Sequence, residues 1–463
     1  MVLRFGVIRQ ATNGCQGNRS ASKMNDSISV NDVGTRNNRP RLVTAVWLCL
    51  FVVVTIMAIT LRLSNREVVE RTPDEKFYIQ YATYVAGSGI EGGRALVQKY
   101  NRDIRLWIYP PPTRLGYIYL VAGVMKLSGV SADRAAVSVS SVFSIGGFFV
   151  AAWLGLRFFD RWAVLVGLAL LSVSPIELAI ARRAWQDSVS GCIGLLLFYL
   201  CLEASISMRP KIWRICFWAA GAYYLTIKGS ALVVYGLCTL WLVGSAWLQE
   251  GSLRKCFYLV VASALVGAAS FAVLAWSSGG AFSVMETIQH SILARGWNKY
   301  GQQFQNGPWY WFFLGFLALS PITTLLCVAG IAMMILPKGA GVASLSLGMR
   351  QRYAAWAIIY LIFTLLIAAT VPAALKNLRY VTILVGPCCL LSGLAVVYLL
   401  AFPRVKLPLW GYHFATCAVA LGLGLACLTD YRRFERIFVR NQLDDLAIVR
   451  VINSARAAGN QSR

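Results

Sequence analysis

The segment TRLGYIYLVAGVMKLSG, residues 113–129, decides the topology of this chain. Its uninterrupted apolar stretch, Leu115 to Met125, has eleven residues, and Lys126 follows directly. A helix needs about 20 apolar residues to cross a hydrocarbon core roughly 30 Å thick. We therefore predict that 113–129 forms a shallow helix on the face of a membrane and does not span it.

The whole sequence has the composition of a polytopic helical membrane protein. Of its 463 residues, 58% are hydrophobic and 14% are charged, with a mean hydropathy of +0.61, whereas soluble domains contain about 25% charged residues. Apolar runs of about 20 residues recur, which predicts an all-α fold and not an outer-membrane barrel of short alternating segments. The expected spans are 42–61, 133–156, 162–178, 188–206, 212–227, 229–248, 256–276, 309–336, 353–371, 381–401 and 409–428.

Short clusters of Lys and Arg between the apolar runs indicate which side each loop faces. If 113–129 stays on the membrane face, all five clusters of the alternate loops fall on the side of the N-terminus. If it crossed, all five would face outward. Because cytoplasmic loops carry an excess of Lys and Arg, we predict a cytoplasmic N-terminus. The clusters are Arg157 and Arg161; Arg209, Lys211 and Arg214; Arg254 and Lys255; Lys338, Arg350 and Arg352; Arg404 and Lys406.

Three regions follow from this topology. Residues 1–41, polar and rich in Asn, Ser and Arg, are predicted to be a disordered cytoplasmic tail. Residues 42–429 form the transmembrane domain, in which 62–112 is the first outer loop. Residues 430–463 form an outer C-terminal tail, which we expect to lie on the lipid surface as an amphipathic helix. Its apolar face would contain Phe434, Phe438, Leu446, Ile448 and Val451.

Charge and cysteine distribution argue against two classes of partner. The net charge of +25 is spread over short clusters without a Lys/Arg-rich block of five to eight residues, so no nucleic-acid partner is expected. The twelve cysteines lie mostly inside apolar runs and form no C-x-x-C pair, which is typical of buried Cys. With His290 and His413 as the two histidines, a His/Cys metal site is not expected.

Four acidic residues are predicted to face outward at the membrane surface: Asp74, Glu75, Glu177 and Asp187. In RTPDEKFYIQYATY, residues 71–84, Thr72 fits an N-cap, Pro73 the first turn and Glu75 the third position of a capping box. Asp187 stands where the next long helix begins, and the helix dipole favours a carboxylate there by about 0.3–1 kcal/mol. Each acid taken alone can therefore be interpreted as part of a helix start.

The outer segments taken together suggest chemistry. Asp74, Asp187, Lys228 and the pair Arg379–Tyr380 are expected to converge on one outward face. One carboxylate can take the proton of a nucleophile, and Lys or Arg can neutralise a departing phosphate, Arg bidentately. The set therefore suits transfer to a hydroxyl or amine from a phosphate leaving group.

Five spaced elements carry a family resemblance. They are PDEKFYIQYATYVAGSG (73–89), YPPPTRLGYIYL (109–120), SPIELAIARRAWQDSVSG (174–191), LTIKGSALV (225–233), and the pair GPWYWFFLGFLALSP (307–321) and LKNLRYVTILVGP (375–387). In these elements the chain resembles GT-C glycosyltransferases of the polyprenyl-phosphate-sugar class, which include protein O-mannosyltransferases and the aminoarabinose transferases that act on lipid A. The resemblance runs from about residue 42 to residue 400.

This resemblance implies a GT-C fold of about 11–13 transmembrane helices with helices in the first outer loop. It implies a membrane glycosyltransferase that moves a sugar from a polyprenyl-phosphate donor to a glycan, lipid or protein acceptor, with inversion at the anomeric carbon. The reaction would take place on the extracytoplasmic face of the cell membrane. The expected partners are the donor, the acceptor and membrane lipids.

The resemblance also implies roles for particular residues. Asp74 takes the place of the family's catalytic carboxylate and would act as the base. Asp187 would orient the acceptor or the sugar, or would share a divalent cation with Asp74, and metal dependence is left open. The candidates for holding the phosphate are Lys228, Arg379 and one of Arg182 and Arg183. The other candidate substrate contacts are Glu75, Arg114, His290 and Tyr380.

One element departs from the family's pattern. Aminoarabinose transferases carry a Lys just before the Pro-Pro segment, where it contacts the donor phosphate. Here residues 107–109 read Trp-Ile-Tyr before Pro110. Arg105 or Arg114 would have to replace that Lys, so the resemblance does not specify the sugar of the donor.

Two alternatives to an active glycosyltransferase are a transporter or flippase for a lipid-linked sugar and an inactive GT-C scaffold that serves as a partner subunit. Transporters place ionisable residues near the bilayer midplane. Asp74 and Asp187 are predicted to lie in or beside outer loops, which favours the enzyme.

Overall fold

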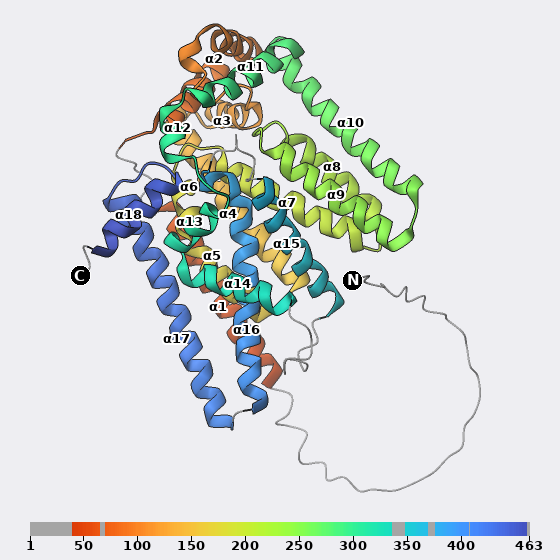
Figure 1. Ribbon diagram of the computed structural model, residues 1–463, viewed down its shortest axis with the longest axis vertical. Coiled ribbons are helices and arrows are strands. Elements are labelled where there is room, and N and C mark those ends of the chain that lie inside the picture. Colours follow the sequence, from red (N-terminus) through yellow and green to blue (C-terminus); the bar gives the residue numbers. More distant parts are fainter. Residues whose placement is uncertain (1–38, 65–69, 336–347, 369–375, 407, 461–463) are drawn as a thin grey trace.

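The described part of the protein is all-helical in its regular secondary structure, as predicted. The computed structural model describes residues 39–64, 70–335, 348–368, 376–406 and 408–460, and no β-strand occurs among them. The predicted tail 1–41 lies outside the described residues except for its last three, which begin the first helix. The helices form a bundle, and several shorter helices gather at one of its ends (Figure 1).

Eight helical stretches in the described part of the chain are long and apolar enough to cross a membrane. They include α1 (Arg39–Leu63), α4 (Ala132–Phe158), α7 (Asp187–Ile206), α9 (Ala231–Glu250), α10 (Leu253–Ser278), α15 (Met349–Ala368), α16 (Val385–Lys406) and α17 (Leu409–Phe434). A ninth span results if α5 (Arg161–Ser172) and α6 (Pro175–Ala181), which are bent by 55° at their junction, are counted as one.

The two remaining predicted spans are occupied by shorter helices. The range 212–227 corresponds to α8 (Pro210–Tyr224), which has 15 residues. The range 309–336 is divided into α13 (Trp311–Leu319) and α14 (Pro321–Ile335), because Pro321 lacks the N–H that would continue the first helix. Within the described residues the expected 11–13 spans therefore reduce to eight or nine by length, although each predicted range contains helix there.

The helices at this end of the bundle include those of the first two sequence motifs, 73–89 and 109–120. They are α2 (Pro73–Arg102), η2 (Ile104–Leu106), α3 (Leu115–Ser128), α11 (Ala281–Leu293), η3 (Ala294–Gly296) and α12 (Lys299–Phe304) (Figure 1). α3 has 14 residues and ends at Gly129, whose φ of +66° suits glycine. It is too short to count among the candidate spans, as predicted for 113–129.

The C-terminal tail differs from its prediction. After α17 the chain continues through a π-helical turn, η5 (Glu435–Arg440), to α18 (Ile448–Asn460). The expectation that this tail lies on lipid was wrong, because Leu446, Ile448 and Val451 are fully buried within the protein. α18 packs against α13, where Gly315 leaves room for Ile448.

Candidate functional site

The start of α2 positions Asp74. Thr72 is the N-cap, its backbone N–H donates to Glu75 Oε2 at 2.9 Å, and the backbone N–H of Glu75 donates to Thr72 Oγ1 at 3.4 Å. This is the predicted capping box, with Pro73 in the first turn. The capping box holds Asp74 in the first turn of α2, where 32% of its side chain is exposed.

Glu75 has a structural role. Its fully buried carboxylate accepts from Arg183 Nη1 at 3.0 Å and from the backbone N–H of Ala184 at 2.8 Å. Arg71 contacts the same carboxylate at 3.4 Å and pairs with Asp133 on α4 at 2.7 Å. Both oxygens of Glu75 accept from protein donors, and these bonds tie the start of α2 to the segment before α7. That Glu75 binds substrate stays a prediction.

Arg379 bridges the two predicted catalytic acids. Its Nη2 donates to Asp74 Oδ2 at 3.1 Å, and its Nη1 lies 4.0 Å from Asp187 Oδ2. Lys228 Nζ donates to Asp187 Oδ1 at 2.6 Å and to the Arg379 carbonyl at 3.3 Å. The structure therefore brings together four residues from the starts of α2 and α7, the turn before α9, and η4 (Leu378–Leu384).

Aromatic rings support these cations. Lys228 Nζ lies 4.4 Å from the ring centroid of Tyr380, and the Arg379 guanidinium lies 4.6 Å from that of Trp185. Arg183 lies on the same Trp185 at 5.3 Å. Contacts of this kind are worth about 0.5–2 kcal/mol each. Sequence reasoning missed Trp185, whose signal was its place between two arginines and Asp187, because Trp is common at any membrane boundary.

Arg114 belongs to the same site. As the N-cap residue of α3, it hydrogen-bonds to the hydroxyl of Tyr78, one turn beyond Asp74 on α2. The Tyr78 hydroxyl in turn donates to Gln186 Oε1 at 2.9 Å, next to Asp187. Burial raises the pKa of Tyr78, so its hydroxyl stays protonated. Tyr78 and Gln186 were not predicted, since a lone Tyr or Gln in a helix carries no signal of its own.

Two predicted candidates lie outside this cluster. Arg182 turns toward the end of α1, where its Nη2 donates to the Leu61 carbonyl at 2.7 Å. Burial lowers the pKa of Arg182 to about 10, so it remains charged at neutral pH. His290 stacks on Trp107 with 3.6 Å between ring centroids, on α11. Of the two arginines proposed as alternatives, Arg183 is therefore the one beside the site.

The cluster carries an excess of positive charge. Arg114, Lys228 and Arg379 face two carboxylates, Asp74 and Asp187, which leaves one positive charge. Burial lowers the pKa of Lys228 to about 8, although Asp187 opposes this shift, so the ammonium is charged at neutral pH. Arg379 Nε is buried and has no hydrogen-bond partner within the described residues. A spare donor and a net positive charge suit an anionic ligand.

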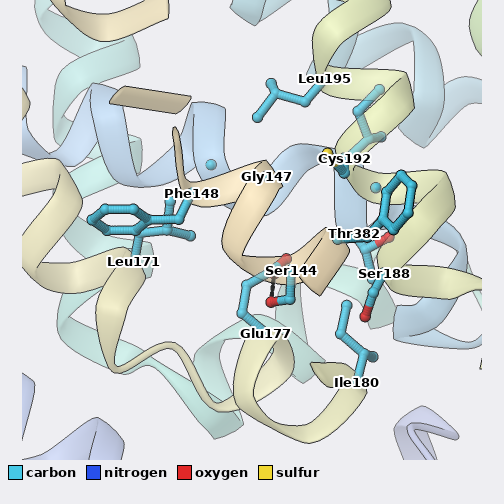
Figure 2. Close-up of a pocket in the computed structure, with 14 residues that line it drawn as sticks. Ser144, Gly147, Phe148, Leu171, Glu177, Ile180, Ser188, Cys192, Leu195 and Thr382 are labelled. Atoms are coloured by element: carbon cyan, nitrogen blue, oxygen red, sulfur yellow. Dashed lines mark hydrogen bonds between the residues drawn. The ribbon is translucent and has the colours of Figure 1, made fainter. Parts of the chain in front are cut away.

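A small cavity lies within the bundle, lined in part by Ser188, the residue that follows Asp187 (Figure 2). It is lined by Ser144, Glu177, Ser188 and Thr382, among others, and holds about 20 Å³, enough for one ordered water. Ser144 Oγ donates to Glu177 Oε2 at 3.2 Å and accepts from Arg62 Nε at 2.9 Å. Glu177, predicted to face outward, instead lines this interior space because α6 bends back into the bundle.

The acids do not fit a divalent metal. Within the described part of the chain, no group of three or more His, Cys, Asp or Glu side chains could hold a metal ion. A hard cation takes about six oxygen ligands, whereas Asp187 is committed to Lys228 and Asp74 to Arg379.

Comparison with known proteins shows the fold. No family model and no curated protein matches the chain. The apo oligosaccharyltransferase of Archaeoglobus fulgidus superposes with a TM-score of 0.56 at 11% identity, over 88% of this chain and 56% of that chain. The chain therefore has the predicted GT-C fold, and it spans a little over half the length of the archaeal enzyme.

A second solved protein is also similar. Apo ArnT from Cupriavidus metallidurans gives a TM-score of 0.49 at 17% identity, over 90% of this chain and 76% of that chain. The same protein bound to undecaprenyl phosphate gives 0.46 at 15% identity, over 88% and 74%.

Proposed function

We propose that this protein is a membrane glycosyltransferase that transfers a sugar from a polyprenyl-phosphate donor to an acceptor. The observation that carries the proposal is Arg379, which joins an accessible carboxylate, Asp74, to a buried one, Asp187, beside Lys228. The GT-C fold supports it. A pair of acids held by cations, with one positive charge in excess, suits a reaction in which a phosphate leaves.

The cations would receive the phosphate. When the bond between the anomeric carbon and the phosphate oxygen breaks, negative charge grows on that oxygen. Lys228 and Arg379 are fixed in place before this happens, and such preorganised donors stabilise developing charge. Arg379 also has the unpartnered Nε–H, and Arg114 adds positive charge beside Tyr78 and Tyr380.

Asp74 would be the base. Its side chain is 32% exposed, against 4% for Asp187, so an acceptor can reach it. The carboxylate takes the proton of the acceptor hydroxyl or amine while that atom attacks the anomeric carbon opposite the phosphate. The bond from acceptor to sugar forms as the bond to phosphate breaks, and this single displacement inverts the configuration.

Asp187 would be a positioning residue. It is buried, and both of its oxygens face cations. Removal of its charge would leave Lys228 and Arg379 without the partner that fixes their geometry. Its predicted alternative role, a metal shared with Asp74, is not supported by the ion pairs that both acids make.

The polyprenyl chain of the donor determines where the donor phosphate would bind along the bundle. A polyprenyl chain would lie along the apolar helices, with its phosphate at the end of the bundle that carries α2 and α3. The positive-inside distribution of Lys and Arg supports a location of that end on the extracytoplasmic side of the cell membrane. The acceptor, whether glycan, lipid or protein, would approach from that side.

A transfer assay tests this proposal. Purified protein in lipid vesicles is given a panel of radiolabelled polyprenyl-phosphate sugars with a cell-envelope extract as acceptor, and release of polyprenyl phosphate is measured. We expect transfer with at least one donor and a loss of about 10²–10³-fold in Arg379→Gln. Arg94→Gln, which removes a cation of α2 that pairs with Glu91 away from the site, is the matched control. Movement of the donor across the bilayer with its sugar still attached would instead identify a flippase.

A further inference from the structure

The chain beyond the last long helix returns to the candidate site. After η5, residues 441–447 lead into α18 without helix or strand, and Gln442 has a positive φ of 47°. Leu443, Leu446 and Ala447 are buried, as are Ile448 and Val451 at the start of α18. This stretch, residues 441–451, is called the strap below.

The strap contacts two segments that carry site residues. The backbone N–H of Leu378 donates to the Leu446 carbonyl at 3.1 Å, and Asn377 forms an antiparallel bridge with Ala447. Asn377 and Leu378 are the two residues that directly precede Arg379. At its other end, the Leu443 carbonyl accepts from Arg183 Nη2 at 3.4 Å. The strap thus joins the segment of Arg379 to the segment that precedes Asp187.

The strap is itself anchored. Arg450 Nη1 pairs with Asp444 at 2.8 Å and with Asp445 at 3.4 Å, and the backbone N–H of Ala447 donates to Asp445 Oδ1 at 3.4 Å. Ile448 packs beside Leu378 at Gly315 of α13. These contacts fix the turn between residues 444 and 450, and with it the carbonyl that holds Leu378.

We propose that the strap is a positioning element of the active site, which sets the place of Arg379 and Arg183 so that donor phosphate can bind. This proposal rests on the proposed function, because Arg379 is taken to hold the leaving phosphate. The two residues before Arg379 are held by backbone contacts with the strap. The position of this backbone determines whether the Arg379 guanidinium can contact Asp74 and Asp187 at the same time. Small displacements of such a group are costly to a reaction.

Substitution of Arg450 tests the strap. Arg450→Gln removes both ion pairs and should raise the KM for donor about tenfold, with a smaller fall in kcat. Arg450→Lys keeps the charge and should recover most of the loss. Arg440→Gln is the matched control, since Arg440 forms an exposed pair with Glu435 just before the strap and should behave as wild type.

Hydrogen exchange gives a readout that does not depend on activity. In Arg450→Gln, the amides of residues 376–384 should exchange faster than in wild type, while those of α4 should not change. If the amides of residues 376–384 exchange at the wild-type rate in Arg450→Gln and its KM for donor is also that of wild type, the proposed positioning role of the strap is wrong. If the wild-type protein transfers no sugar, the proposed function fails and the exchange measurement alone decides whether the strap holds this segment.

Discussion

Lys228 gives a pH dependence that can be worked from the structure. Burial lowers the pKa of its ammonium to about 8, with Asp187 2.6 Å away opposing the shift, whereas an ordinary Lys titrates near 10.4. If the charged ammonium binds donor phosphate, kcat/KM for the donor should fall as the pH rises through about 8. At about pH 9, roughly one tenth of the molecules would keep the charge.

The same shift has the opposite effect on stability. Between about pH 8 and pH 10.4 the unfolded chain binds more protons at Lys228 than the folded protein does, so this residue makes unfolding less favourable as the pH rises. Its contribution to stability is lost as the pH falls through about 8. A fall in activity above pH 8 is therefore not a consequence of unfolding at this residue.

The assay is donor kcat/KM across about pH 6.5–9.5, because this parameter reports groups of the free enzyme. Thermal unfolding is measured at the same pH values. Lys228→Arg keeps its charge over this range. Above about pH 8, donor kcat/KM of this variant should therefore fall less steeply than that of wild type. The reasoning is refuted if the wild-type profile is flat to the alkaline end, or if Lys228→Arg shows the wild-type fall.

Two further predictions concern stability and metal. Glu75→Gln should lower the free energy of unfolding by about 3–5 kcal/mol, because it leaves Arg183 buried without a counter-charge. Glu91→Gln, at an exposed pair on the same helix, should change it by at most about 1 kcal/mol; equal melting temperatures for the two variants in detergent would contradict this. Transfer should also be unaffected by EDTA, since the ion pairs of Asp74 and Asp187 use the oxygens that a cation would need; loss of transfer with EDTA and its recovery with Mg²⁺ or Mn²⁺ would show the opposite.

Local signals in the sequence predicted the elements of the site well. The capping box at Thr72 and Glu75 depends on four neighbouring residues, and it is present as predicted. The apolar length of 115–125 decided that α3 is short, and the structure agrees. The convergence of Asp74, Asp187, Lys228 and Arg379 followed from topology, because their segments were placed at the same end of the bundle.

Contacts that involve backbone groups, or that join segments distant in the sequence, could not be predicted from the sequence alone. Arg182 and Arg183 are adjacent in sequence, and only packing decides that one turns to the Leu61 carbonyl and the other to Glu75. The strap contacts Arg183 and Leu378 through carbonyl groups, which have no residue signature. Its apolar residues fit a lipid-facing helix equally well by pattern, so burial in the protein could be found only in three dimensions.

The most direct test of the proposed mechanism is sugar transfer by Asp74→Asn. The amide keeps an oxygen that can accept from Arg379 but cannot take a proton from the acceptor. We predict that single-turnover transfer falls about 10²–10⁴-fold while the variant still binds the polyprenyl-phosphate sugar. Transfer at the wild-type rate would contradict the account, and Asp74 would then be part of a helix start and not the base.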